Sequence, residues 1–243
     1  MAHFVGVDGC KGGWFAVWQA STGIKEDFGT GIHSQIYSSI VDLWQEHSDA
    51  VRILIDIPIG LKESEDRGLE KQVRKLLGPR RSSVFPVPCV AAAYAQDYIA
   101  ASALNRQNIG KGLSKQAWFI TPLIRDVDQF LQHSSTARMV LGECHPELAF
   151  AMLNGAPLPD SKKTTNGQTQ RHDLIQDHFP QLDQFLEGCL AQHRRATLKL
   201  DDCLDALVLL VTARTGRKLN VQPEEGVGGV PIDMWIPDIP GYY

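Results

Sequence analysis

Acidic residues stand at the ends of three apolar segments that lie far apart in the chain. Asp8, Asp56 and Glu143 each follow a run of the kind that forms a buried strand. A carboxylate in such a place is costly to bury unless a positive charge compensates it. Acids that recur in this way predict one shared cation, and their oxygen ligands suit Mg²⁺ or Mn²⁺.

Two further acids, Asp202 and Asp205, open an almost wholly apolar segment that is typical of a buried helix. They are three residues apart, so they share one face of that helix. Asp201 is four residues from Asp205 and could pair with it equally well, so the spacing leaves the choice between Asp201 and Asp202 open. Each acid alone is explained as a turn or a helix cap. Their recurrence favours a shared site, because functional groups of open α/β sheets gather at the carboxyl ends of strands.

The composition is that of an ordinary globular protein. The chain has 243 residues, of which 43% are hydrophobic and 21% are charged, and its net charge is −4. We expect one domain over residues 1–243 and exclude a protein coated in basic charge, although a local basic groove is compatible with this balance. Five scattered cysteines without a CxxC pair indicate reduced thiols in a cytoplasmic protein. No apolar run reaches the length of a membrane span, so we expect no membrane partner.

Glycine-rich turns and apolar periodicity predict an α/β fold, a mixed sheet with flanking helices. Strands are expected at 3–8 and 14–18, and residues 60–135 are expected to form a helical insertion. The helices expected in the insertion lie near 69–77, 90–104 and 116–132, with a proline-rich loop at 78–88. The other expected elements are strands near 24–28, 51–57, 138–143 and 232–236, helices at 34–47, 146–153, 170–187 and 201–214, and a mobile loop at 154–169.

The order of a hairpin strand ended by an acid, a second acid-ended strand and a late Asp-x-x-Asp helix resembles the ribonuclease H-like superfamily. Residues 202–207 are similar to the last helix of the Holliday-junction resolvase RuvC. The whole chain resembles the domain of unknown function 429 family, a group of predicted nucleases. The segments that carry this second resemblance are 6–14, 55–61, 80–86, 143–147 and 202–206. The resemblance implies a ribonuclease H-like fold with a helical insertion.

The resemblance also implies a reaction, the divalent-metal-dependent hydrolysis of phosphodiester bonds in DNA or RNA, and leaves the oligomeric state open. Asp8, Asp56, Asp202 and Asp205 match the metal ligands of the superfamily, although RuvC has a glutamate in place of Asp56. Asp8 would bridge two cations about 4 Å apart. Glu143 is a further catalytic candidate without a clear counterpart in RuvC, and its alternative role is to hold the insertion in place.

Substrate contacts are expected from basic and hydroxyl side chains beside the acids. The candidates are Lys11 in the hairpin turn and the run Arg80, Arg81, Ser82 and Ser83 in the proline-rich loop. Guanidinium and hydroxyl donors suit phosphate oxygens. The competing interpretations are that Lys11 is an exposed lysine in a turn and that residues 80–83 belong to a solvated loop.

Four other residues carry weaker signals. His145 is a candidate base or a packed histidine after a strand. Lys162, Lys163 and Arg171 flank the expected mobile loop, where they could close over a substrate or be surface charge.

Two other function classes fit the same fold. A small-molecule phosphotransferase or ATPase of the actin-like relatives also begins with an Asp-Gly hairpin, but that fold uses two such domains and this chain has room for one. A non-catalytic binding protein that retains the fold is the second alternative. Metal binding with nuclease activity, nucleotide binding, or neither would separate the three.

Overall fold

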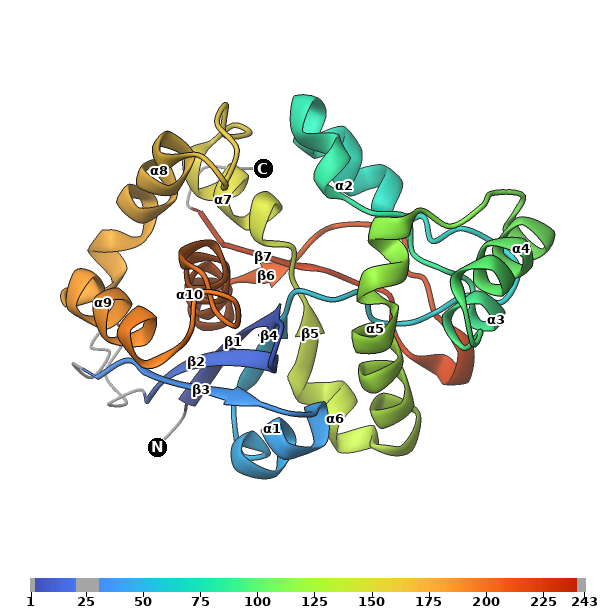
Figure 1. The fold of residues 1–243 in the computed structure, drawn as a ribbon, viewed down its shortest axis with the longest axis horizontal. Helices are drawn as coiled ribbons and strands as arrows, with labels where there is room; N and C mark the ends of the chain where they lie inside the picture. The colour runs from blue at the N-terminus through green and yellow to red at the C-terminus, as the bar shows by residue number, and fades with distance from the viewer. Residues whose placement is uncertain (1–2, 21–30, 240–243) are drawn as a thin grey trace.

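The computed structural model describes residues 3–20 and 31–239 of the chain. Their centre is a five-stranded mixed sheet with the strand order β3-β2-β1-β4-β5 (Figure 1). β1 (His3–Cys10) pairs antiparallel with β2 (Gly13–Ala20), which pairs antiparallel with β3 (His33–Tyr37). β4 (Arg52–Ile55) lies parallel to β1, and β5 (Leu141–Glu143) lies parallel to β4. The mixed α/β architecture predicted from the sequence is confirmed.

Helices cover both faces of this sheet. The apolar helix α10 (Leu200–Thr215) packs on one face, against a core that includes Phe15 and Leu54. On the other face, α1 (Ile40–His47) and α5 (Lys115–His133) share a core with alternate residues of the same strands. The alternation of side chains along each strand supplies both cores from one sheet.

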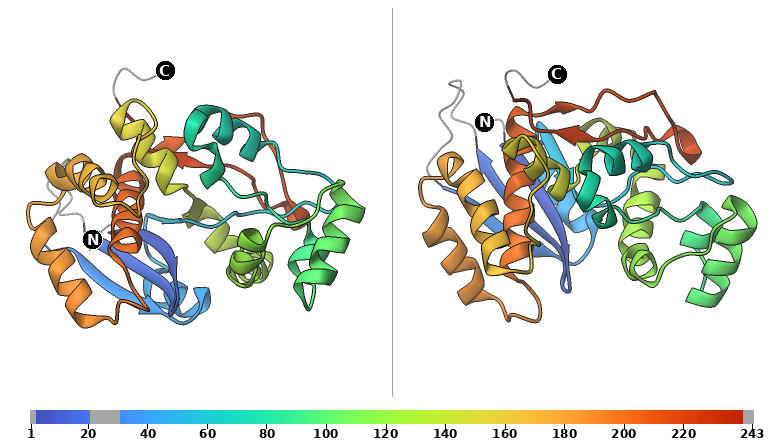
Figure 2. Two further views of the ribbon diagram at one scale, coloured as in Figure 1. Left: turned by 45° about the horizontal axis from the view of Figure 1, so that its top comes forward. Right: turned by 90° about the horizontal axis from the view of Figure 1, so that it is seen from above.

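The helices other than α1 and α10 form two groups in the chain, one after β5 and one between β4 and β5 (Figures 1 and 2). One group is α7 (Pro146–Asn154), α8 (Thr165–Ile175) and α9 (Leu182–Gln192). The other lies in the chain between β4 and β5 and comprises α2 (Leu69–Leu77), the 3₁₀ segment η1 (Gly78–Ser83), α3 (Val90–Ala93), α4 (Tyr98–Ile109), α5 and α6 (Ser135–Val140). Two short 3₁₀ segments, η2 (Gln176–His178) and η3 (Val227–Gly229), lie in the last third of the chain. β6 (Arg217–Lys218) and β7 (Trp235–Ile236) form a separate two-stranded sheet.

Gly6 sets the distance between α10 and the sheet. A Cβ atom at this position would lie 2.2 Å from the carbonyl oxygen of Ala206 and 2.3 Å from the amide nitrogen of Leu210. Both are backbone atoms of α10, so a side chain at residue 6 would force the helix or the strand to move. Because side chains two residues apart point to the same face of a strand, Asp8 also faces α10.

Two predicted elements are wrong in type at their start. The expected helix 34–47 begins as strand β3, and α1 starts only after Ser39, whose hydroxyl accepts the Asp42 amide. The expected strand 138–143 begins as helix α6, and only residues 141–143 pair with β4. In both places a serine cap starts a helix that apolar spacing alone does not locate.

The later elements differ in a similar way. The expected helix 170–187 is two helices, α8 and α9, separated at Pro180, and α8 begins inside the expected loop 154–169. The expected strand 232–236 is β7, which pairs with β6 and does not extend the main sheet. The strand expected near 24–28 lies outside the described residues. In residues 3–20 and 31–239, none of the helices is both long and apolar enough to cross a bilayer.

Candidate functional site

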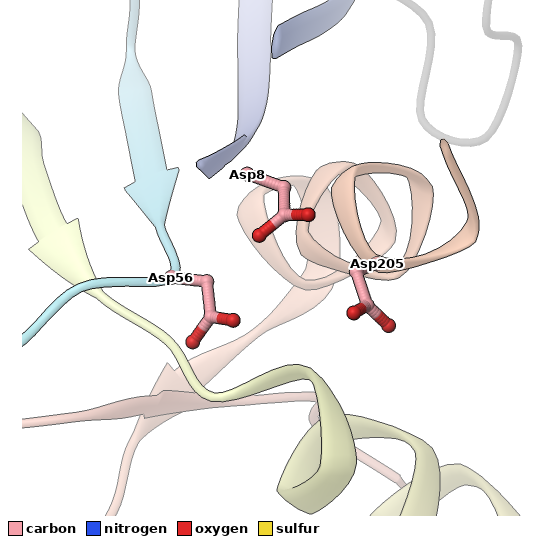
Figure 3. Close-up of side chains that lie close together, drawn as sticks. All are labelled: Asp8, Asp56 and Asp205. Carbon is pink, nitrogen blue, oxygen red and sulfur yellow. The ribbon is translucent and has the colours of Figure 1, made fainter. Parts of the chain in front are cut away.

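Three aspartates from three separate elements converge at the carboxyl ends of β1 and β4. Asp8 lies on β1, Asp56 directly follows β4, and Asp205 lies in the second turn of α10. Each can offer a carboxylate oxygen, and these three oxygens lie within 4.8 Å of one another. The three carboxylates point into a shared space (Figure 3). We call these residues the acidic triad.

Backbone pairing brings the triad together. The amide of Asp56 donates to the carbonyl of Val7 at 3.0 Å, which continues the parallel pairing of β4 with β1 by one residue. Asp56 therefore stands beside Asp8 on the side of the sheet that faces α10. The close approach of α10 at Gly6 then brings Asp205 over both.

Burial dominates the electrostatics of the triad. Asp8 is 6% exposed and Asp205 is 1% exposed. Burial, followed by the charges of Asp205 and Asp56, raises the pKa of Asp8 well above its ordinary value. Burial also raises the pKa of Asp205 to about 7, against the opposing charge of Lys162, and raises the pKa of Asp56. Burial therefore disfavours the ionised form of all three carboxylates, and a cation bound between them would stabilise that form.

Lys162 supplies part of the missing positive charge. Its Nζ makes an ion pair with Oδ2 of Asp205 from the loop that precedes α8. Burial acts to lower the pKa of Lys162, but the charges of Asp205 and Asp8 outweigh it and hold that pKa above its ordinary value. One ammonium group against three carboxylates leaves the triad with a deficit of positive charge when all three are ionised.

Asp202 lies beside the triad but serves the helix end. Its Oδ2 accepts the backbone amide of Lys199 at 2.9 Å, which caps the start of α10. Burial raises the pKa of the Asp202 carboxyl. Asp202 lines the same cavity as the triad, and its second oxygen could join a ligand shell there.

The triad lines a cavity of about 570 Å³, and we call its part of the lining the floor. One part of the wall is basic and polar, and another part is apolar. The basic and polar part is lined by Arg80, Ser82, Ser83, His145, Lys162 and Lys163, and the apolar part by Ile57, Pro58, Phe85, Pro86, Ile120 and Leu123. Such a cavity lies in the size range of small-ligand sites.

Glu147 fastens the two basic segments of this wall to each other. Its Oε1 accepts from Nε of Arg80 at 2.9 Å, and its Oε2 accepts from Nη2 of Arg171 at 2.8 Å. Arg171 is fully buried and also donates to the carbonyls of Gly167, at 2.7 Å, and Asp160, at 3.3 Å. The proline-rich loop and the loop that carries Lys162 therefore share one buried carboxylate. Arg171 is a structural clamp in this arrangement.

Glu143 belongs to a second buried ion cluster. Its Oε2 accepts from the amide of Ile59 at 2.8 Å and from Nη2 of Arg67 at 2.7 Å, and Arg67 also pairs with Glu70 at 3.0 Å. Burial raises the pKa of Glu143 to about 7, against the charge of Arg67. Glu143 lines the cavity, but these bonds tie β5 to the segment that follows β4. They match the alternative role in which Glu143 holds the insertion in place.

The predicted substrate contacts divide into two groups. Arg80, Ser82 and Ser83 line the cavity, whereas Lys11 and Arg81 are exposed and lie outside its lining as far as the described residues form it. Ser83 donates its hydroxyl to the carbonyl of Arg80 at 2.8 Å, which keeps the η1 segment compact.

His145 stands at the edge of this group. Its Nε2 lies 3.3 Å from the carbonyl of Ser83, and its Nδ1 is buried without a partner among the described residues.

Three site residues carry little signal in the sequence. Arg67, Glu70 and Glu147 are buried charges whose partners lie elsewhere in the fold. The one local sign is Glu147 in the otherwise apolar start of α7, because a lone charge in a buried helix needs a partner. Arg67 and Glu70 are three apart, but the contact of Arg67 with Glu143 spans 76 residues.

Comparisons with known proteins give one match. The sequence model of the family described as "Protein of unknown function (DUF429)" matches residues 6–225. No curated protein and no solved structure matches the chain.

Proposed function

Since the chain belongs to the DUF429 family, whose description assigns no activity, we propose a function from the site itself: divalent-metal-dependent hydrolysis of phosphodiester bonds in nucleic acid. The observation that carries the proposal is the acidic triad at the floor of a cavity with a basic wall. The proposal includes a ribonuclease H-like fold and Mg²⁺ or Mn²⁺ as the cofactor.

The arrangement of strands supports this fold. An antiparallel hairpin carries the first acid, and a parallel strand beside it leads to the second. A late helix packed on both carries the third. These are the features through which the sequence resembles the ribonuclease H-like superfamily.

The chemistry of the donor set supports the cofactor. Asp8, Asp56 and Asp205 offer hard carboxylate oxygens of the kind that Mg²⁺ and Mn²⁺ prefer. Magnesium keeps several of its waters in proteins, so three protein carboxylates are enough to hold it. A buried cluster of acids that one lysine neutralises only in part gains stability from a divalent cation. The residues present therefore fit the cofactor.

A bound divalent cation would act as a Lewis acid toward the phosphate and favour ionisation of the attacking water. In the reaction, the water oxygen forms a bond to phosphorus and the bond from phosphorus to the leaving sugar oxygen breaks. The leaving oxygen takes a proton, so the products are a phosphate monoester and a hydroxyl group. Arg80, Ser82, Ser83 and Lys163 offer donors to the non-bridging phosphate oxygens from the cavity wall. Lys162 reaches the centre from the same wall and can pair with Asp205 or with a phosphate.

The test is a nuclease assay with single- and double-stranded DNA and RNA in Mg²⁺ or Mn²⁺. We expect cleavage by the wild type that chelation removes and that Asp205→Asn lowers by at least about 10²-fold, since a triad carboxylate is lost. Asp201→Ser is the matched control, because Asp201 lies next to the site in sequence but outside the lining of the cavity in the described part of the chain. This control should retain activity.

Three results would contradict the proposal. Cleavage that survives in Asp205→Asn would place the chemistry elsewhere. Metal and nucleotide binding without cleavage of nucleic acid would favour the phosphotransferase alternative. Absence of both nucleic-acid cleavage and nucleotide binding would favour a binding protein that retains the fold.

A further inference from the structure

The cavity offers an apolar surface next to its charged floor, and the hydrolysis of a phosphate ester alone does not explain that surface. Phe85, Ile120 and Leu123 line the cavity together with the triad and the basic residues. Phe85 is 38% exposed, although a large aromatic side chain is normally buried. An aromatic ring left accessible in a cavity is suited to pack against a flat, apolar part of a ligand.

The backbone around Phe85 is firmly held. Val84 and Val87, which flank Phe85 and Pro86, are buried in two different apolar clusters. The carbonyl of Val84 accepts from Nε of Arg74 at 3.2 Å and from its Nη2 at 3.0 Å.

The far end of this segment is held as well, because the amide of Cys89 donates to Oδ1 of Asn105 at 2.9 Å. Proline at 86 and 88 restricts the backbone between these contacts. Phe85 is therefore presented to the cavity by a segment that is anchored at both ends.

We propose that the substrate is single-stranded nucleic acid, and that a base adjacent to the cleaved phosphate stacks on the ring of Phe85. This inference rests on the proposed nuclease function and names its substrate class. A phosphate held over the triad by the basic wall leaves its attached nucleoside to occupy the apolar part of the same cavity. Stacking on an aromatic ring is the common way in which proteins hold single strands, because every base has an aromatic face.

The burial of the acids argues for a single strand over a duplex. Asp205 and Asp8 line the cavity but are almost inaccessible to solvent, so the chain that carries the phosphate must enter the cavity. The bases of a duplex are already stacked on their neighbours, and exposing one of them requires it to be flipped out at a cost of a few kcal/mol. An unpaired strand avoids that cost.

The test compares the kcat/KM of the wild type and Phe85→Ala on a single-stranded oligonucleotide and on the same oligonucleotide with abasic sugars placed in turn on each side of the cleaved bond. Stacking of one base is worth about 5- to 150-fold. We expect Phe85→Ala to lose that factor on the intact strand. At one abasic position the wild type should lose the same factor, and Phe85→Ala should lose little more.

Two further variants keep the result interpretable. Phe119→Ala is the matched control, since Phe119 is 75% exposed on α5 and lies outside the cavity lining among the described residues. Phe85→Leu retains apolar bulk without an aromatic face, so it protects the fold and should still lose most of the factor. Phe85→Trp should retain activity, and its fluorescence should change when the single strand binds.

The outcomes distinguish this inference from the proposed function. Cleavage of single strands that is equal in Phe85→Ala and Phe119→Ala would overturn the stacking role and leave the nuclease function standing. Cleavage of a duplex with the same kcat/KM as the single strand would overturn the substrate class alone. Absence of cleavage on every nucleic acid would overturn both.

Discussion

Replacement of Gly6 by alanine tests how the fold positions the candidate metal centre. The added Cβ would lie 2.2 Å and 2.3 Å from backbone atoms of α10. Ordinary contacts begin near 3.4 Å, so the helix and the strand must separate by roughly 1 Å. Neither clashing atom belongs to a flexible side chain, so the strain cannot be relieved by a rotamer change.

Two effects should follow from this separation. Overpacking in a rigid core costs about 3 kcal/mol, which corresponds to a fall in Tm of about 6–12 °C for a chain of this length. Asp205 would also move away from Asp8 by about the same distance, which disturbs the shared set of metal ligands. A displacement of about 1 Å in a catalytic site lowers the reaction rate by about 10²-fold. We therefore expect Gly6→Ala to lower both stability and affinity for Mg²⁺ or Mn²⁺.

Thermal unfolding by circular dichroism and metal titration by calorimetry measure the two effects. Gly188→Ala is the control, because a Cβ at Gly188 in α9 meets no atom within 4 Å. That variant should keep its metal affinity and gain up to about 1 kcal/mol from better helix propensity. A Gly6→Ala protein with unchanged Tm and unchanged metal affinity would refute the positioning argument.

Two other predictions concern buried charges. The pKa of Asp205 is about 7 in the folded protein and 3.8 in the unfolded chain, so the folded state holds an extra proton between these values and stability falls as pH rises through this window. With metal removed by a chelator, the free energy of unfolding of the wild type should therefore fall by about 3 kcal/mol between pH 5 and 8 relative to that of Asp205→Asn. Urea titrations measure both free energies. If the difference between the two proteins did not change with pH, the prediction would be contradicted. Arg67→Ala should lower the free energy of unfolding by about 3–5 kcal/mol at pH 8, because Glu143 and Glu70 would remain buried without their partner. If urea titration gave a decrease in this free energy below about 1 kcal/mol, the ion cluster would not be needed for stability.

Much of the fold and of the triad could be predicted because short-range patterns encode them. Asp8 and Asp56 follow apolar strand segments, and parallel pairing in register brings such residues side by side. Asp205 follows from an apolar helix that must be buried on a sheet. The prediction of a helix over 34–47 was wrong at its start because Ile36 fits helical spacing although it belongs to β3. Ser39 marks the true start of the helix.

The rest of the site depends on contacts that no local pattern carries. Lys162 meets Asp205 across 43 residues, and Arg67 meets Glu143 across 76. Their positions depend on how loops fold back over the sheet, which periodicity does not describe. Phe85 stands out only when its exposure is compared with the burial of Val84 and Val87 beside it. Such residues become visible once the tertiary structure is known.

The central claim is that the acidic triad binds a divalent cation, and the thermal response of Asp8→Asn to metal tests it most directly. For the wild type, Mg²⁺ or Mn²⁺ at about 100 times its Kd should stabilise the fold by about 2.7 kcal/mol, which raises Tm by about 5–11 °C. Asp8→Asn should remain folded in chelator, since it relieves repulsion from Asp205 and Asp56, and should lose most of that rise. Asp201→Ser should keep it. An equal rise in Tm for the wild type and Asp8→Asn would contradict the account.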